Sequence, residues 1–199
     1  MCGENRIPGA ASPNSETPLL LVATLDLGDP RLNVPPGKVE RLHLFYPWTC
    51  AGNEGVFSYR ETGSEVELLS FTSGEAYTDF PYPNYPPFFP EVGLALEPIS
   101  AAEQDAIHKL NRGDGGYFAI TASFPRLAVP PSQVGGEPLL LQNPLPERRC
   151  PSCQNLMPLL ACIGDRNGSE HGFVDNDFVQ MLFYFCAPCT VVISENQTD

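Results

Sequence analysis

The chain has 199 residues, of which 42% are hydrophobic and 10% are aromatic, so it is long enough for one substantial core and has a globular composition. Acidic residues outnumber basic residues by 24 to 11, and the formal net charge of -13 disfavours binding to nucleic acid or to anionic membranes. No segment reaches the roughly 18 consecutive apolar residues of a membrane-spanning helix, so we expect a chain that does not span a membrane.

The first part of the chain predicts strands. Residues 1–17 are polar and are expected to form a flexible lead-in to a single domain over residues 18–199. The 22 prolines and 17 glycines predict many turns and favour a β-rich fold. The first half of the domain, about residues 18–97, contains short apolar or alternating runs that indicate strands. These predicted strands are Leu19–Leu27, Val39–Tyr46, Gly55–Arg60, Val66–Phe71 and Val92–Glu97.

A long loop rich in aromatic residues and prolines covers residues 80–90. Its prolines restrict the conformations of Tyr82, Tyr85 and Phe88, and restricted aromatic side chains lose little entropy when a partner packs against them. The sequence therefore predicts a partner-binding surface at these three residues. The alternative is a loop that folds back over its own core.

One short helix is predicted to begin at Ser100, where Ser100-Ala-Ala-Glu103 forms a capping box and Gly113 is a suitable stop. The second half of the domain, about residues 117–194, again predicts strands. Its expected elements are strands at Tyr117–Ala122, Met157–Ile163, Phe178–Phe185 and Val191–Ser194, and an extended segment over Val134–Gln142 that contains a glycine turn.

Two Cys-x-x-Cys pairs carry the strongest chemical signal in the chain. Cys150 and Cys153 form the first pair, and Cys186 and Cys189 form the second. Four thiolates delivered by two tight turns match the tetrahedral shell of a structural zinc ion. Such a closed shell leaves no position for water, so the pattern predicts a scaffold role for the metal rather than catalysis.

The alternatives for these cysteines are two disulfides, a redox pair or four unrelated thiols. A redox pair is disfavoured because neither motif opens a predicted helix, where the dipole would lower a thiol pKa. The odd total of seven cysteines fits poorly with an oxidised framework. We therefore expect a reduced, cytoplasmic protein.

An apparent internal repeat relates the two halves. Leu21–Leu25 resembles Leu159–Ile163, and each is followed by Leu-Phe-Tyr, at Leu44–Tyr46 and at Leu182–Tyr184. The separation from Ala23 to Leu44 equals that from Ala161 to Leu182. This pattern predicts a duplicated strand-loop-strand unit, although two apolar strand pairs can also resemble each other by coincidence. The expected fold is α+β and β-rich, with two pseudo-symmetric sheet halves sharing one core and one short helix.

With this repeat, the chain resembles the YwqG-like bacterial family and is more distantly similar to the C-terminal domain of programmed cell death protein 2. The positions that match the family pattern are Gly135, Gly136, Gln142, Cys150, Cys153 and Asp175. Thr24 and Cys162 stand where the family has glutamine, which indicates a divergent member. The resemblance implies an internally duplicated α+β fold. Relatives resemble chaperones, or immunity proteins encoded beside secreted toxins, and both kinds of relative point to protein binding.

No catalytic motif is recognisable. His43 is expected in a strand, partly buried or at the surface, and His108 is expected to be solvated on the helix. His171 lies in an acidic loop with Glu170, Asp175 and Asp177. This loop can bind a basic side chain or a cation, but it lacks the spacing of an EF-hand; the alternative is a solvated acidic loop. We count these four residues as a second partner-binding candidate.

Together these patterns predict a non-enzymatic, zinc-stabilised acidic protein that binds a basic protein. The most concrete form is an immunity protein that neutralises a basic, nuclease-type bacterial toxin. One alternative is a chaperone for a basic client such as a ribosomal protein. Another is a small-molecule sensor or enzyme with a pocket between the two halves. The sequence leaves the oligomeric state open.

Overall fold

The computed structural model describes residues 3–13, 16–32, 34, 38–47, 57–71, 88–127, 132–142, 144–164 and 179–198. Strands dominate these ranges, and two α-helices lie between them in the chain. The elements in chain order are β1 (Leu20–Asp26), η1 (Pro30–Leu32), β2 (Arg41–Tyr46), β3 (Phe57–Glu61), β4 (Val66–Ser70), α1 (Ala101–Asn111), α2 (Tyr117–Ser123), η2 (Pro125–Leu127), β5 (Gln133–Val134), β6 (Leu159–Gly164), β7 (Val179–Cys186), η3 (Ala187–Cys189) and β8 (Val191–Thr198).

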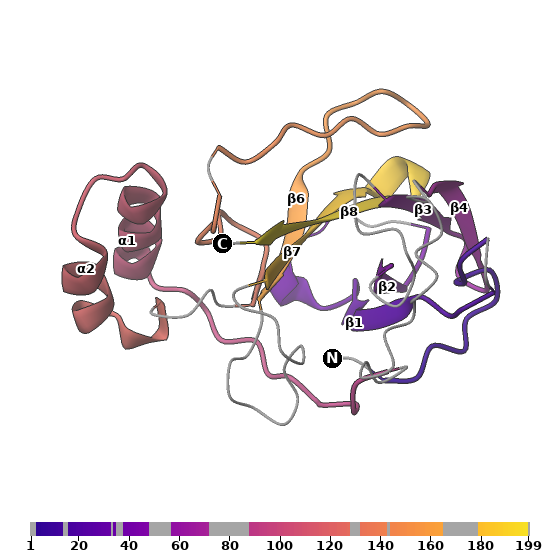
Figure 1. The fold of residues 1–199 in the computed structure, drawn as a ribbon, viewed down its shortest axis with the longest axis horizontal. Coiled ribbons are helices and arrows are strands. Elements are labelled where there is room, and N and C mark those ends of the chain that lie inside the picture. Colours follow the sequence, from indigo (N-terminus) through magenta and orange to yellow (C-terminus); the bar gives the residue numbers. More distant parts are fainter. Residues whose placement is uncertain are drawn as a thin grey trace.

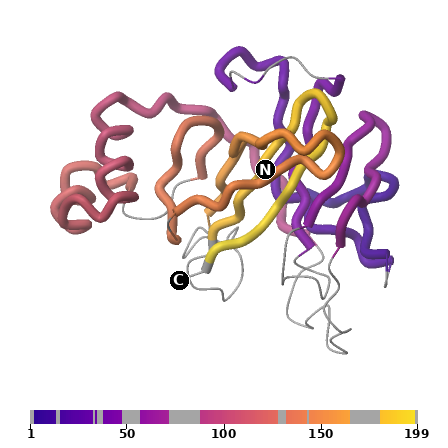
Figure 2. The backbone as a smooth tube through the Cα atoms, turned by 90° about the horizontal axis from the view of Figure 1, so that it is seen from above, coloured from indigo at the N-terminus to yellow at the C-terminus, as the bar shows by residue number. Residues whose placement is uncertain are grey.

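The strands form two sheets. β1 and β2 form an antiparallel pair with Ala23 opposite Leu44, and the other six strands form an antiparallel sheet in the order β4-β3-β8-β7-β6-β5. Figure 1 shows the β1–β2 pair facing the larger sheet, with α1 and α2 at the end of the molecule away from β3 and β4. Figure 2 shows the same separation of the helices from β1–β4 when the molecule is seen from above.

The main core lies between the two sheets. Both faces of β7 are covered, so apolar and polar residues do not alternate along this strand. Met181, Phe183 and Phe185 belong to the cluster shared with β1 and β2. Leu182 and Tyr184 point to the opposite face, where they join a second cluster with Cys150 and Met157. Because both faces of β7 are covered, every position from 181 to 185 is buried and apolar or aromatic.

Side-chain amides attach the segment 139–142 to the larger sheet. Gln180, which is fully buried, donates to the Leu139 carbonyl at 2.6 Å and accepts from the Leu141 N–H at 3.1 Å. Gln197 makes the same two kinds of contact with the backbone of Gln142, at 3.1 and 3.0 Å. The amides thus replace the ladder of a neighbouring strand and satisfy buried backbone groups.

The helices form a small separate cluster. The capping box predicted at Ser100 and Glu103 is confirmed, and α1 ends one residue before Arg112. Asn111 at the end of α1 donates to the Pro138 carbonyl at 2.8 Å and accepts from the Leu140 N–H at 3.0 Å. These two hydrogen bonds link α1 to the segment that Gln180 and Gln197 attach to the larger sheet.

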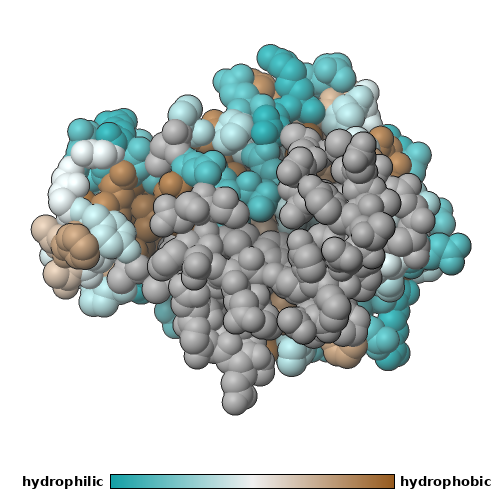
Figure 3. All heavy atoms as spheres, in the orientation of Figure 1, coloured by the Kyte–Doolittle hydropathy of each residue, from teal (hydrophilic) through white to brown (hydrophobic). Residues whose placement is uncertain are grey.

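The prediction of a strand at Tyr117–Ala122 was wrong, because this segment is helix α2. A strand needs a neighbour for its backbone, whereas the helix satisfies its own hydrogen bonds and packs Ile120 against the cluster of Ala106 and Ile107. The expectation of one helix is corrected to two. α2 leaves Tyr117 and Phe118 exposed at 44% and 85%, and Figure 3 shows apolar residues at the surface of this end of the molecule.

Most other predicted strands are confirmed within one or two residues of their ends, but Val92–Glu97 has no regular structure. Its residues are largely exposed, and no strand in the described part of the chain pairs with them. Of the predicted segment Val134–Gln142, only the start belongs to a strand. The glycine turn is confirmed, because Gly135 and Gly136 both have φ near +70°.

The sheets do not follow the two predicted halves. β1 and β2 form their own sheet, whereas β3 of the first half pairs with β8 of the second half, with Tyr59 opposite Val192. The larger sheet therefore contains strands from both halves, and the two halves share one core through it.

Residues 3–13 of the predicted lead-in pack against the domain. Asn5 donates to the Leu19 carbonyl at 2.9 Å, and the Pro8 carbonyl accepts from the Val66 N–H at 2.8 Å. Gly9 allows this approach, because a Cβ there would lie 1.9 Å from the Val66 carbonyl oxygen. Among the described residues, no helix has the length and apolar character needed to cross a membrane.

Candidate metal centre

Four cysteine sulfurs converge at one end of β7 and β8. The Sγ atoms of Cys150, Cys153, Cys186 and Cys189 all lie within 4.8 Å of one another. The first two come from a turn in the segment before β6, and the last two come from the connection between β7 and β8. The structure thus brings together the two pairs that sequence spacing had selected.

The first turn is held by its own backbone. Arg149 and Leu156 form an isolated antiparallel bridge, and the Met157 N–H donates to the Arg148 carbonyl at 2.8 Å. Inside this bridge the Gln154 N–H donates to the Cys150 carbonyl at 2.8 Å. The hairpin therefore presents Cys150 and Cys153 on one short loop.

The second turn is the hairpin between β7 and β8. Cys186 pairs with Val191 at the ends of the two strands, and the connection is η3 with Pro188 in its first turn. Proline fixes φ and suits this position. The strands therefore determine where Cys186 and Cys189 lie.

Both turns end in the same uncommon backbone conformation. Gln154 follows Cys153 with φ +62°, and Thr190 follows Cys189 with φ +52°. This left-handed region is unfavourable for residues other than glycine, particularly for a β-branched residue such as threonine, and costs of order 1–3 kcal/mol. Strain of this kind persists where surrounding interactions determine the conformation. Here it occurs directly after the second cysteine of each pair.

The sulfur positions fit a metal ion rather than disulfides. Cys153 Sγ and Cys186 Sγ are 3.7 Å apart, far beyond the roughly 2.05 Å of a sulfur-sulfur bond. A tetrahedral ion with metal-sulfur bonds of about 2.3 Å requires an edge of about 3.8 Å between sulfurs. All five cysteines in the described ranges are free. The four clustered cysteines can therefore hold one metal ion.

The local environment shifts the thiol pKa in opposite directions at Cys153 and at Cys186. Burial raises the pKa of the Cys186 thiol to about 12, although the neighbouring Cys189 N–H acts in the opposite direction. The Asn155 N–H is the main cause that lowers the pKa of the Cys153 thiol. A cation bound by these sulfurs would displace their protons and compensate the cost of burying thiolate charge.

Four protein sulfurs fill all positions of a tetrahedral ion. A catalytic zinc site keeps one position for water or substrate, whereas a four-cysteine site does not. The arrangement can therefore link the hairpin of Cys150 to the β7–β8 hairpin across the second core cluster, without supplying a reactive ligand.

Most predicted partner-binding residues lie outside the described ranges, namely Tyr82, Tyr85, Glu170, His171, Asp175 and Asp177. Phe88 is described and is 41% exposed, whereas its neighbour Phe89 is buried in the main core. The end of the aromatic loop therefore contributes one residue to the surface and one to the interior.

Two histidines have carboxylate partners that sequence patterns did not reveal. His43 on β2 contacts Glu61 on β3 through its ring Nδ1, and its backbone N–H donates to the same carboxylate at 2.9 Å. His108 on α1 contacts Glu137 at 2.6 Å. Glu61 is only 2% exposed, so its contacts with His43 give a buried carboxyl group hydrogen-bond partners.

Gln154 and Thr190 also belong to the cysteine centre, although they were not predicted. Their position directly after the second cysteine of each pair was the available signal. Neither is a glycine, the residue that ordinarily adopts this conformation, so residue type did not identify them.

Comparison of the chain with protein-family models, with curated proteins and with solved structures finds no match in any of the three.

Proposed function

We propose that this chain is a zinc-stabilised, non-enzymatic binding protein whose acidic surface captures a basic protein. Its most concrete form is an immunity protein that neutralises a nuclease-type toxin. The observation that carries this proposal is the excess of exposed carboxylates that form no ion pair among the described residues.

Zinc is the metal that best suits the four cysteines. Thiolates are soft ligands, and zinc accepts tetrahedral sulfur coordination without a redox change. Iron also accepts four thiolates, so elemental analysis of the purified protein is the direct measurement. One equivalent of zinc per chain supports the proposal, and less than about half an equivalent contradicts it.

The exposed acidic residues fall into two groups. Some already contact a basic side chain, such as Glu4 with Arg6, Glu67 with Arg60 and Asp105 with Lys109. Others have no ion-pair partner within the described ranges and remain available to a cationic surface. This second group comprises Glu16, Asp26, Glu40, Glu65, Glu91, Asp114 and Glu147.

Such a surface suits a nuclease-type partner for an electrostatic reason. An enzyme that holds a phosphate backbone presents a positive cleft, and an acidic protein can reach that cleft rapidly by electrostatic steering. Charge then increases the association rate, while apolar contacts around residues such as Phe88 would slow dissociation.

We also propose that the β1–β2 and β6–β7 pairs derive from one duplicated unit, as in the YwqG-like family. Both pairs are antiparallel, and each has an irregularity at the same place in the repeat, between Leu21 and Ala23 and between Leu159 and Ala161. The partner strands differ by one residue, because Ala23 faces Leu44 whereas Ala161 faces Phe183. This support is independent of the metal.

The binding proposal can be tested with two variants of equal net charge. In the first, Glu40, Glu65 and Glu147 are changed to glutamine; these residues form no ion pair within the described part of the chain. In the control, Glu4, Glu67 and Asp105 are changed to the corresponding amides. All of these side chains are exposed, so both variants are expected to fold.

Affinity capture from the producing cell, followed by mass spectrometry, identifies the partner. We expect a basic protein that binds the wild type and the control, with slower association for the first variant and at high salt. Inhibition of a captured nuclease supports the immunity role, whereas a ribosomal protein supports the chaperone alternative. Repeated capture of no basic protein contradicts both.

A further inference from the structure

A pocket of about 420 Å³ adjoins the cysteine centre. Residues 38, 39 and 60–62 line one side, and residues 152 and 188–190 line the other. The pocket thus lies between the two predicted halves, and each Cys-x-x-Cys turn contributes to its wall. Its volume falls in the range of small-molecule sites.

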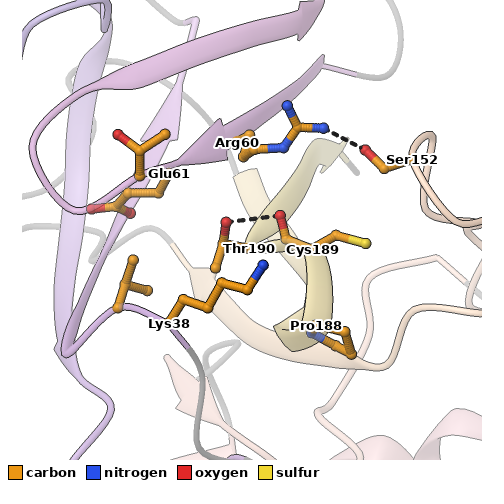
Figure 4. A pocket seen from close by; sticks show the side chains of 9 residues that line it. Lys38, Arg60, Glu61, Ser152, Pro188, Cys189 and Thr190 are labelled. Atoms are coloured by element: carbon orange, nitrogen blue, oxygen red, sulfur yellow. Dashed lines mark hydrogen bonds between the residues drawn. The ribbon is translucent and has the colours of Figure 1, made fainter.

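Two cations reach this pocket from different elements. Figure 4 shows the Lys38 ammonium beside Thr190 and the Arg60 guanidinium directed toward Ser152, and both residues line the pocket. The Arg60 guanidinium contacts Glu67 with one nitrogen and donates to the Ser152 hydroxyl at 2.7 Å with another. Its position is therefore fixed by one contact to β4 and one to the first cysteine turn.

Among the described cations, Lys38 belongs with Arg41, Arg112 and Arg149 to the minority that form no ion pair. Arg6, Arg31, Lys109 and Arg126 each form an ion pair with a carboxylate. In the same described ranges no ion pair includes Lys38. Its ammonium group therefore keeps three donors for a ligand.

The nearby negative groups are directed elsewhere. Glu61 lines the pocket, but one of its oxygens contacts the His43 ring and the other accepts from the His43 N–H. A divalent ion held by four thiolates would carry a formal charge of about -2. In Figure 4, however, the Cys189 sulfur points away from the Lys38 ammonium.

The remaining donors suit a tetrahedral oxyanion. Because the Ser152 oxygen accepts from Arg60, its hydroxyl hydrogen is available to donate, as are the other N–H groups of Arg60. Val39 and Pro188 supply apolar wall beside these donors. The volume exceeds what a free phosphate needs, so it also accommodates the organic part of a phosphate ester.

We propose that this pocket binds a phosphate group, held by Lys38, Arg60 and Ser152. This site is separate from the proposed recognition of a basic protein. It does rest on the proposed metal, because the turn that carries Ser152 and the turn that carries Thr190 meet at the four sulfurs. Loss of the metal should therefore weaken phosphate binding.

The chain contains two lysines, Lys38 and Lys109, and this provides an internal control. Metal-loaded protein is treated with limiting acetic anhydride in phosphate-free buffer, with or without inorganic phosphate, and acetylation of each lysine is measured by mass spectrometry. Phosphate is expected to slow acetylation of Lys38 and to leave Lys109, which contacts Asp105 on α1, unchanged. Equal effects on both lysines, or no effect, would overturn the proposal.

Calorimetry with inorganic phosphate, ribose 5-phosphate and ribose then distinguishes a free phosphate from a phosphate ester as the ligand. Saturable binding of the two phosphates but not of ribose is expected, with tighter binding of the ester if the apolar wall contributes. Lys38→Gln should weaken binding about tenfold, since one charge-assisted hydrogen bond is lost, whereas Lys109→Gln should not. Binding of neither phosphate in the millimolar range contradicts the proposal.

Metal content is measured on the same samples. It distinguishes phosphate binding from a charge-balancing role of Lys38, and failure of this proposal from failure of the proposed function. If Lys38→Gln reduces the metal content and wild-type protein binds no phosphate, Lys38 instead balances the charge of the cysteine centre and the pocket proposal is wrong. If wild-type protein with its full metal content binds phosphate but captures no basic protein, only the proposed function fails.

Discussion

The hydroxyl group of Tyr59 on β3 accepts a hydrogen bond from the backbone N–H of Phe45 on β2 at 3.0 Å. The same hydroxyl donates to the His43 carbonyl at 2.6 Å. Within the described ranges β2 pairs only with β1, along one of its edges. Along the other edge, Tyr59 provides two of the backbone hydrogen bonds that a neighbouring strand would otherwise provide. One side chain thus connects the smaller sheet to the larger one inside the core, where Tyr59 and Phe45 are fully buried.

Replacing Tyr59 with phenylalanine should therefore destabilise the protein by about 1–3 kcal/mol, because two buried backbone groups lose their partner. The measurement is urea unfolding at neutral pH. Tyr117→Phe is the control, because Tyr117 is 44% exposed and its change should have little effect. Equal stability of Tyr59→Phe and wild type would show that the bridge contributes nothing.

Replacing Cys153 with serine should remove the metal. We expect metal content well below one equivalent and a loss of about 4 kcal/mol of unfolding free energy, the stabilisation from a ligand at roughly a thousand times its dissociation constant. Cys162→Ser is the matched control, since Cys162 is a buried free cysteine outside the four-sulfur cluster. That variant should retain its metal.

Chelation offers the same test without a mutation. A strong chelator should lower the melting temperature of wild type and of Cys162→Ser, but should leave Cys153→Ser unchanged because no metal remains to be removed. A chelator effect of equal size on all three proteins would mean that the stabilising ion binds elsewhere.

The left-handed conformation at Gln154 predicts a preference for glycine. Gln154 is exposed, so its replacement changes little packing. Gln154→Gly should be at least as stable as wild type, because relief of strain offsets the greater flexibility of the unfolded chain. Gln154→Val should be less stable than the glycine variant by about 2 kcal/mol. A valine variant as stable as the glycine variant would contradict the assigned backbone.

The start of α1 should respond to acid. Contacts with Arg126 and with Ser100 lower the pKa of Glu103 from 4.5 to about 2. A lowered pKa in the folded state means that the ionised carboxylate contributes stability above pH 4.5, and that this contribution is lost as the pH falls toward 2. Glu103→Gln should thus be less stable than wild type at pH 7, and the difference should shrink between pH 4.5 and 2.

Unfolding curves of both proteins at several pH values measure this difference. Glu97→Gln is the comparison, because Glu97 is 80% exposed and lies 3.7 Å from Arg126. A stability difference between Glu103→Gln and wild type that stays constant down to pH 2 would rule out the proposed contact.

Local patterns were sufficient for much of the fold and for the cysteine centre. The apolar run of β7 indicates a strand that is buried on both faces, and this signal depends only on the local sequence. The alternation in β2 located the strand but not its burial, because Leu44, Phe45 and Tyr46 are all buried. The capping box of Ser100 and Glu103 is also a local interaction, and it correctly placed the start of α1. The two Cys-x-x-Cys pairs indicated a shared site because each tight turn can deliver two sulfurs to one ion.

By itself, then, the sequence determined where most strands lie, where α1 begins and which sulfurs meet. Only the tertiary structure decided that Tyr117–Ser123 is a helix, that β3 pairs with β8 and that Tyr59 completes the edge of β2. The same holds for the pocket formed by Lys38, Arg60 and Ser152. These features depend on contacts between residues far apart in the chain, and the free energy of such contacts is absent from any local pattern.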